Sequence, residues 1–390
     1  CGTGIESATV IDHLEINDLP LDGRLATQLV LIAVASVNVT GGDLTGRKQF
    51  FSSQAISVAG SQGNSLTFML DGSDHNDPFS NVNLPFPFPD ALREFSVSTS
   101  ALPAQYGTHP GGAVNAVTLS GTNAFHGVLF EYWRNNIFNA LGYFSVKDTL
   151  HRNQYGGTIG GPILHNKLFF FGGYQGTHNV QQAVSTSAKV PTPAMIAGDW
   201  STYESASCVS SGKARQLKDP TTGQPYPNNQ IPVSQYNSST LKLLDYLPAA
   251  SDSCGNVKYG ILNNSDEWQS IGRVDWTISQ RQSAFARYFI DDYGVPATYI
   301  PHNLLVSTQS GNQERAQTLT IGHTLVINSS TLNVMHGSFT RRRDDRLPAA
   351  DGINGPAIGS NIYAHEKNSL RLSVPGNFSM SCSACAQGKF

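Results

Sequence analysis

From residue 122 onward, the sequence is a succession of extended segments joined by connections that are in turn short and long. Within each segment, apolar residues alternate with polar or small ones, which is the period-two pattern of a β-strand. The short connections are 165–166, 279–282 and 328–330. The long connections are 135–152, 178–266 and 292–314. The seven predicted strands are Phe125–Arg134, Asn153–Leu164, Lys167–Thr177, Glu267–Ile278, Ser283–Asp291, Arg315–Ile327 and Thr331–Arg342.

This alternation of connection lengths favours antiparallel strands that run up and down through an outer membrane. Such barrels have short turns on the periplasmic side and long loops outside. Strand length agrees, because a transmembrane β-strand needs about 9–11 residues. A sheet edge is not tolerated in lipid, since each unpaired backbone group costs several kcal/mol. Seven strands cannot complete a bacterial barrel, so we expect the wall to continue beyond them and the chain to be a fragment.

The segment Arg152–Thr177 reads as one hairpin of this wall, with His165 and Asn166 in its turn. Tyr155, Ile159 and Ile163 recur on one face, and small or polar residues occupy the other. Glycine weakens a strand but allows another part of the chain to come close. We therefore expect the aromatic face to meet lipid and the glycines of the inner face to lie against an inner domain. The run 169–171 cannot be assigned to a face by this pattern.

The same reasoning assigns the faces of the segment 270–278. Gly272, Val274, Trp276 and Ile278 are predicted to face lipid. Ile271, Arg273 and Asp275, which alternate with them, are predicted to face inward.

Composition excludes several classes of protein. The 390 residues carry a net charge of −3, which argues against a nucleic-acid-binding protein. The one basic run, Arg341–Arg343, is followed by two aspartates, and we interpret it as a solvated strand end. No segment has the roughly 20 consecutive apolar residues of a membrane helix. The chain opens at Cys1 without a signal peptide, which adds to the expectation that it is a fragment.

The cysteines favour an oxidising compartment. Cys208 and Cys254 bracket one long polar segment, and Cys382 and Cys385 lie close together near the end, which predicts two disulfides and an unpaired Cys1. Zinc would need a second Cys or His pair at ligand spacing, which the sequence does not show.

Residues 1–122 have a different, compact and turn-rich texture. A short helix is predicted within 21–34, beginning near Asp22, and one helical turn within 90–93. Short strands are predicted at 55–58, 65–70, 94–100 and 113–119. The prolines of 84–89 predict a stiff extended connector, because each one fixes φ.

Four motifs follow one another along this region. The first is Leu70-Asp71-Gly72, and the second is a strand that begins at Glu94. The third is Tyr106-Gly107, and the fourth is the pair Gly111-Gly112 followed by Asn115. This ordered set resembles the plug domain of TonB-dependent transporters, and more narrowly the Oar-like branch, which the segments 85–89, 102–107, 153–162 and 168–176 also resemble. The resemblance implies a plugged barrel of about 22 strands in the outer membrane of a Gram-negative bacterium. It also implies a TonB-type inner-membrane partner. We expect the family's TonB box and the closing strands to lie outside these residues.

The sequence lacks the motifs of an enzyme site, including the nucleophile elbow, the zinc-binding His-Glu-x-x-His helix and the phosphate-binding P-loop. We therefore expect no catalytic residues, no cofactor and no metal. Asp74, Asn76 and Asp77 lie in a polar loop whose spacing does not fit an EF-hand. An Asx-rich turn is the favoured interpretation. The alternative is a plug loop that faces the substrate.

The sequence thus predicts a mainly β chain, with a small mixed α/β plug domain at 1–122 and an incomplete transmembrane β-barrel at 123–390. Its long external loops would be 135–152, 178–266, 292–314 and 343–390. The expected function is energised uptake of a large or scarce substrate, with ligand contacts in the external loops. The alternative is a surface-exposed β-rich adhesin or binding protein without transport.

Overall fold

The structure is a computed structural model. It describes residues 8–39, 50, 53–99, 102, 109–140, 149–181, 186–260, 264–307, 311–347, 353–363, 370–380 and 387–389. Tyr106, Gly107, Cys1, Cys382 and Cys385 lie outside the described residues. No helix of the described residues is long and apolar enough to cross a membrane.

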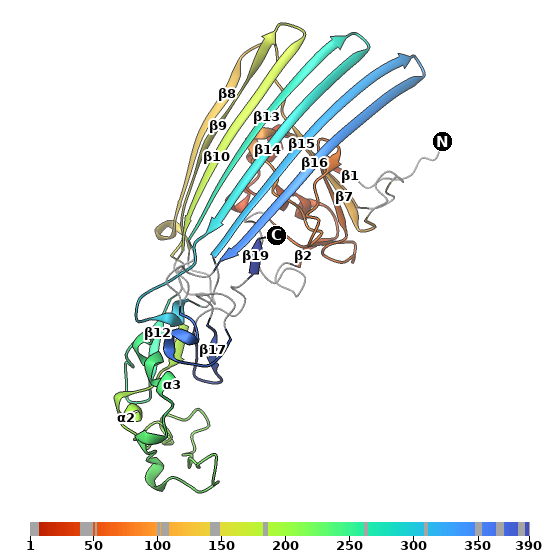
Figure 1. The fold of residues 1–390 in the computed structure, drawn as a ribbon. Helices are drawn as coiled ribbons and strands as arrows, with labels where there is room; N and C mark the ends of the chain where they lie inside the picture. Colours follow the sequence, from red (N-terminus) through yellow and green to blue (C-terminus); the bar gives the residue numbers. More distant parts are fainter. Residues whose placement is uncertain are drawn as a thin grey trace.

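A curved antiparallel sheet of eight strands dominates the structure (Figure 1). Its order is β19-β16-β15-β14-β13-β10-β9-β8, so neighbours in the sequence are neighbours in space, and the sheet does not close. The strands are β8 (His126–Asn135), β9 (His151–Leu164), β10 (Leu168–Val180), β13 (Ser265–Ser279), β14 (Gln282–Val295), β15 (Gly311–Asn328), β16 (Thr331–Leu347) and β19 (Gln387–Lys389). We call the seven long strands β8–β10 and β13–β16 the wall.

All seven predicted strands are confirmed, and most extend further than predicted. β14 runs to Val295 and β15 begins at Gly311, so the predicted long connection 292–314 is shortened at both ends. Continuous backbone pairing from Gln282↔Leu325 to Val295↔Asn312 accounts for this extension. The pairing satisfies backbone groups even where the polar sequence no longer alternates.

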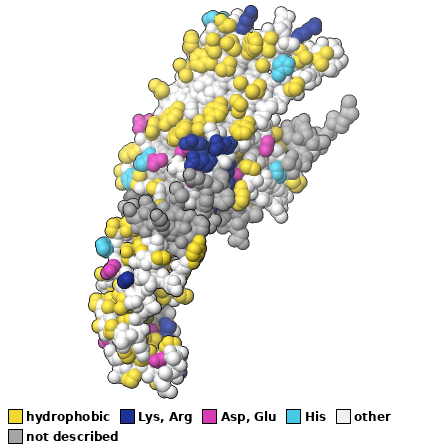
Figure 2. All heavy atoms as spheres, viewed as in Figure 1, with side chains coloured by type: hydrophobic (Ala, Val, Ile, Leu, Met, Phe, Trp, Pro, Cys, Tyr) yellow, Lys and Arg dark blue, Asp and Glu magenta, His cyan; other side chains and the backbone are white. Residues whose placement is uncertain are grey.

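The faces of the wall agree with the predicted alternation. Val274, Trp276 and Ile278 are exposed on the outside, whereas Ile271 and Arg273 are buried on the inside. Apolar side chains spread over the outer surface of the wall in Figure 2. The aromatic run 169–171 alternates faces like the rest of β10, which pairs with β13 without interruption. Phe170 pairs with the outward Val274, while Phe171 is buried on the inner side.

The described residues between 8 and 119, which we call the inner unit, lie on the concave side of the wall (Figure 1). Their five-stranded sheet has the order β1-β6-β7-β4-β5, and only β4 and β7 pair in parallel. The strands are β1 (Ala8–Asp12), β4 (Leu66–Leu70), β5 (Ser73–Asp74), β6 (Leu92–Ser98) and β7 (Gly112–Thr118), beside a separate pair β2 (Ser36–Asn38) and β3 (Ile56–Val58). Short helices α1 (His13–Asp18), η1 (Asp22–Arg24), η2 (Ala26–Ile32) and η3 (Pro89–Ala91) complete the unit.

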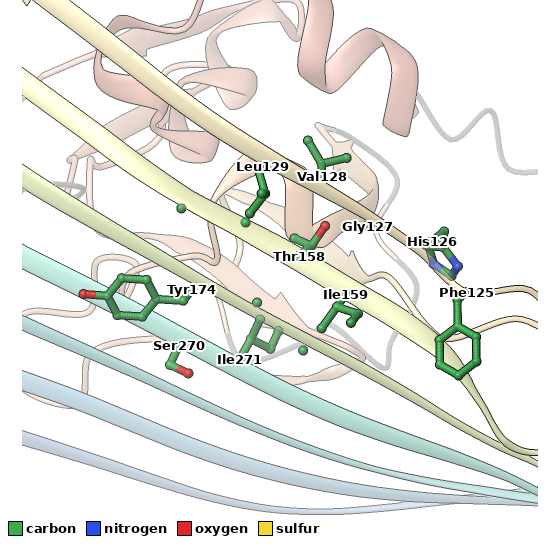
Figure 3. Close-up of a pocket in the computed structure, with 14 residues that line it drawn as sticks. Phe125, His126, Gly127, Val128, Leu129, Thr158, Ile159, Tyr174, Ser270 and Ile271 are labelled. Carbon is green, nitrogen blue, oxygen red and sulfur yellow. The ribbon is translucent and has the colours of Figure 1, made fainter.

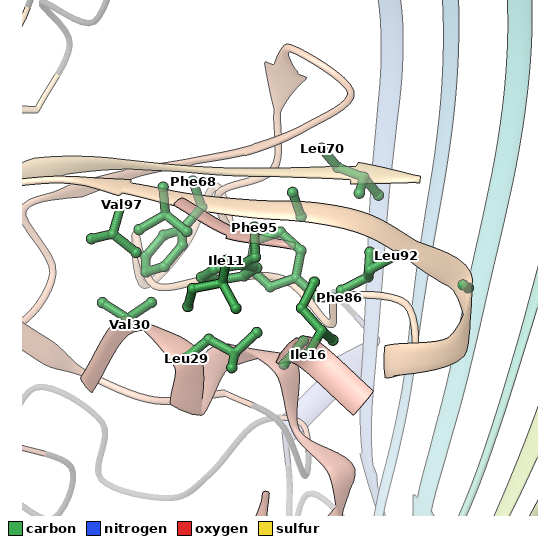
Figure 4. Close-up of a cluster of buried hydrophobic side chains, with 14 of the residues drawn as sticks. Ile11, Ile16, Leu29, Val30, Phe68, Leu70, Phe86, Leu92, Phe95 and Val97 are labelled. Atoms are coloured by element: carbon green, nitrogen blue, oxygen red, sulfur yellow. The ribbon is translucent and has the colours of Figure 1, made fainter. Parts of the chain in front are cut away.

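The core of the inner unit forms between its sheet and its helices (Figure 4). Ile16 and Leu29 from the helices meet Phe68 and Phe95 from the sheet. The helix predicted within 21–34 forms as two 3-10 segments, because Leu25 between them is extended, and Gly23 has a left-handed φ of 73° inside the first segment. Strand β1 and helix α1 were not predicted, although Asp12 caps α1 with a capping box.

Three long connections pack together beyond one end of the wall, and we call them the loop module. Val190 and Leu243 from the first, Leu305 from the second and Ile358 from the third share one hydrophobic cluster. Cys208 and Cys254 are joined by a disulfide. The elements of these and the remaining connections are β11 (Thr186–Lys189), β12 (Asn256–Tyr259), β17 (Leu372–Val374), β18 (Phe378–Met380), α2 (Pro193–Ile196), α3 (Ser238–Leu243), η5 (Asn136–Phe138), η6 (Pro227–Asn229), η7 (Val233–Gln235), η8 (Leu244–Tyr246), η9 (Leu304–Val306) and η10 (Pro356–Ile358).

Candidate functional site

The inner unit and the wall share one continuous hydrophobic core. Phe171, Ile271 and Phe289 of the wall belong to the same cluster as the buried residues of the inner unit. At Gly173, a Cβ atom would lie 2.8 Å from the Phe88 ring of the inner unit. The wall strand needs glycine there, as the sequence predicted for the inner face of this hairpin.

A tight turn places Asp71 at the centre of this interface. Asp71 and Gly72 both have left-handed φ angles, 52° and 73°, and they join β4 to β5. Two such residues are the signature of a two-residue hairpin turn, for which Asp-Gly is a preferred sequence. The Asp71 carboxylate accepts hydrogen bonds from the Thr118 backbone N–H (2.9 Å) and hydroxyl. Its position is therefore fixed by the inner unit itself.

Two arginines of the wall converge on this carboxylate. Arg273 Nη1 donates to Oδ1 at 2.9 Å, and Arg287 Nε donates to Oδ2 at 3.1 Å. Arg287 also donates to the Leu70 carbonyl oxygen, while Asp275 accepts hydrogen bonds from Nε and Nη2 of Arg273. Two carboxylates thus balance two guanidinium groups, which a buried ionic cluster requires to be stable.

A second buried ion pair joins Asp77 of the inner unit to the wall. Both Asp77 oxygens lie 3.1 Å from Arg342 Nη1, and Arg342 Nη2 also contacts Glu314 and Asp344 at 3.2 Å. The prediction that the basic run 341–343 is simply a solvated strand end is wrong for Arg342, whose side chain is buried. Arg341, its neighbour on the opposite face of β16, is exposed.

A third contact is more open to solvent. Asp22 of the inner unit pairs with Arg134 and with Arg152, the latter at 3.0 Å. Gln154 Nε2 adds a hydrogen bond to the Gly23 carbonyl oxygen at 2.9 Å. Between the described residues of the two parts, every ion pair therefore has its carboxylate in the inner unit and its arginine in the wall.

The polar loop that the sequence singled out lies within this interface. Asn76 is buried, accepting from Phe68 N at 2.7 Å and donating to Leu66 O at 2.9 Å. Asp77 caps backbone N–H groups of the loop in addition to its pair with Arg342. Asp74 is exposed. The structure thus places an Asx-type network at 76–77, and the exposed Asp74 carboxylate accepts a hydrogen bond from Asn76 N at 3.3 Å.

His75, in the same loop, is completely buried. Its Nε2–H donates to the Pro85 carbonyl oxygen at 2.7 Å, and its ring lies against Phe86 and Phe289. Burial lowers the pKa of His75 to about 3, because a charged imidazolium would lose its hydration there. His75 is therefore neutral and connects the loop to the stiff segment 84–89.

The predicted plug motifs are only partly brought together. Leu70, Asp71 and Gly72 meet Asn115, whose Oδ1 accepts from Gly72 N at 3.2 Å. Gly111 lies against Ser65, and Gly112 has a φ of 146° at the start of β7. Glu94 of β6 is half-buried and lies opposite Asp12 of β1 in the strand register, away from the ion pairs.

A groove of about 1000 Å³ lies along strands β8, β9, β10 and β13 (Figure 3). Val128, Leu129 and Ile159 give it an apolar lining. Nothing in it resembles a reactive constellation, and no three His, Cys, Asp or Glu side chains in the described part of the chain come together as a metal site. The interface of the inner unit with the wall is therefore the best candidate for the functional site.

Comparison with known proteins assigns the wall to a family. A family model described as an outer membrane beta barrel domain matches residues 117–389. The chain belongs to this family. Its wall is therefore that of an outer-membrane β-barrel, which places the chain in the outer membrane of a Gram-negative bacterium.

Named relatives include transporters and receptors. The TonB-dependent transporter Oar of Myxococcus xanthus is 32% identical over 128 residues, covering 30% of this chain and 12% of Oar. The outer membrane transporter YddB from Escherichia coli has a similar fold, with a TM-score of 0.55 and 10% identity, covering 100% of this chain and 45% of YddB. A mutant of the ferric enterobactin receptor from Pseudomonas aeruginosa has a TM-score of 0.52 and 14% identity, covering 87% of this chain and 41% of the receptor. The chain thus spans less than half the length of these relatives.

Sequence reasoning did not identify the arginines that meet the carboxylates. Arg273 was predicted to face inward, but nothing marked it as a partner of Asp71. The available signal was an arginine on the inner face of an otherwise apolar strand, since a buried charge needs a partner. Arg287 carries the same signal between Phe285 and Phe289, whereas Arg342 lies between the polar residues Thr340 and Asp344 and does not.

Proposed function

We propose that this chain is the plug and the first part of the barrel of a TonB-dependent outer-membrane transporter, with the domain division at residues 1–122 and 123–390. Its function would be the energised uptake of a large or scarce substrate. The observation that carries the proposal is the placement of the inner unit on the concave side of an outer-membrane wall, attached by buried acid–arginine pairs. The identity with Oar supports the Oar-like branch.

The interface supplies a physical basis for gating. Asp71 and Asp77 attach the inner unit through hydrogen-bonded ion pairs, which are directional and are lost over a small displacement. A force applied to the inner unit by a TonB-type inner-membrane partner would break these contacts together. Differential binding and movement, rather than covalent chemistry, would then perform the transport, so the protein would not be an enzyme.

The loops are assigned to substrate capture. The loop module lies beyond the wall on the side of the long connections, which is the outer side in such barrels. The exposed Asp74 carboxylate is the loop residue of 74–77 best placed to meet a substrate. A surface adhesin would need the loop module but would have no use for an inner unit held inside the wall.

Conductance in planar bilayers tests the plug role. The full protein should insert and stay closed, whereas a variant lacking residues 8–119 should insert and conduct. Uptake then tests energy coupling, because accumulation of the substrate should require an intact TonB-type partner. Recovery of the full protein in the soluble periplasmic fraction would refute the proposal.

A further inference from the structure

Two carboxyl groups lie in contact with each other inside the wall, beneath the inner unit. Glu267 on β13 and Asp291 on β14 are 5% and 0% exposed. Their carboxyl groups are within hydrogen-bonding reach of each other. Gln269, directly opposite Asp291 in the strand register, donates from Nε2 to Asp291 Oδ2 at 2.8 Å.

One positive charge, that of Arg152, acts on this carboxyl pair from nearby. Neither Glu267 nor Asp291 forms an ion pair among the described residues, although every other buried cluster at this interface contains an arginine. The nearby Arg152 is directed to Asp22 and Asn179. Two adjacent carboxylates shielded from water are strongly destabilising unless a proton or a cation neutralises them.

The unpartnered atoms distinguish a proton from a cation. Three side-chain oxygens here have no hydrogen-bond donor: Glu267 Oε1, Gln269 Oε1 and Asp291 Oδ1. One shared proton would satisfy the contact between the carboxyl groups but would leave the amide oxygen without a partner. A cation can bind carboxylate and amide oxygens at the same time. Carboxylate and amide oxygens are the ligands that Ca²⁺ prefers, with water completing its shell.

We propose that Glu267, Gln269 and Asp291 form a binding site for a divalent cation of the Ca²⁺ class, between the wall and the inner unit. The site reaches the inner unit directly, because Gln269 Nε2 also donates to the Phe86 carbonyl oxygen at 3.3 Å. Cation binding therefore holds Gln269 in the orientation that the seated inner unit requires. By thermodynamic linkage, cation binding stabilises the seated inner unit, and the seated inner unit strengthens cation binding.

Calorimetric titration of the EDTA-treated full protein in detergent with Ca²⁺ tests this site. We expect one saturable site in the wild type and at least tenfold weaker binding in Glu267→Gln and Asp291→Asn. The matched control is Asp266→Asn, whose exposed carboxylate lies on the opposite face of β13 and contacts His178. This variant should bind Ca²⁺ as the wild type does.

A second measurement tests the site in case the Glu267 and Asp291 variants do not insert into a membrane. Ca²⁺ should raise the urea midpoint for release of the inner unit in the wild type, and Gln269→Met, which keeps both carboxyl groups, should reduce that shift. Absence of saturable Ca²⁺ binding in the wild type, or unchanged binding in Glu267→Gln, overturns the site and leaves a shared proton as the neutralising species. The titration measures binding alone, so its result is independent of transport.

Discussion

The Nε atom of Arg287 in the wall donates a 3.1 Å hydrogen bond to Oδ2 of Asp71 in the inner unit, and both side chains are almost completely buried. These residues are 216 positions apart in the sequence. The Asp-Gly turn that places Asp71 and the strand register that places Arg287 therefore have to be correct together. The pair couples the folding of the inner unit to its seating in the wall.

Replacing Asp71 with asparagine should loosen the inner unit strongly. The substitution leaves Arg273 and Arg287 buried with too little negative charge, and breaking a buried pair in this way costs about 3–5 kcal/mol. We expect a lower urea midpoint for inner-unit release, measured by protease susceptibility in detergent. The control is Asp22→Asn, whose carboxylate is 63% exposed and should matter by less than about 1 kcal/mol. Equal effects of the two variants would contradict the central role of Asp71.

Gly72→Ala should destabilise the interface more than Gly60→Ala does. Both glycines have left-handed φ angles, 73° and 79°, so both variants carry similar backbone strain. At Gly72 the new Cβ would also lie 2.9 Å from the His336 ring of the wall, whereas Gly60 has no atom within 4 Å. We expect an extra loss of about 1–3 kcal/mol at Gly72, read from the same urea transitions. Identical losses would mean that the turn does not press against β16.

His75 should make the inner unit sensitive to acid. Its pKa is lowered by burial from 6.5 to about 3. The unfolded chain therefore gains a proton as the pH falls below about 6.5, while the folded chain stays neutral until about pH 3. His75 therefore does not lower the free energy of unfolding above pH 6.5, but lowers it by about 1.4 kcal/mol per pH unit between pH 6.5 and pH 3. Urea midpoints between pH 7 and 4 should fall less steeply in His75→Gln, and parallel curves would disprove the contribution.

The disulfide should stabilise the loop module without affecting the wall. Cys208 and Cys254 are 46 positions apart, and closing a loop of that length is worth about 4 kcal/mol in the chain-entropy model. We expect the double Cys→Ser variant to be cut by protease within 186–260. Heat-modifiable gel migration, which reports the barrel, should be unchanged. Resistance of the variant to protease would show that the hydrophobic cluster alone maintains the module.

The wall is the part of the fold that sequence reasoning predicted best. Alternation between Ile271, Arg273 and their outward neighbours is a local signal, because each side chain reports which face it occupies. Strand ends were less predictable, since β14 and β15 continue by backbone pairing into polar sequence. Strand β1 was missed because its five residues carry no long pattern and are held by pairing with β6.

The fold class and the seven wall strands followed from the sequence alone, because period-two alternation acts between residues close together in the chain. Only the tertiary structure decided that Asp71 meets Arg273 and Arg287, that Asp77 meets Arg342, and that Glu267 touches Asp291. These contacts depend on how the inner unit sits against the wall, which no local pattern encodes. The polar loop predicted as an Asx-rich turn therefore also attaches the inner unit to the wall, through the buried Asp77.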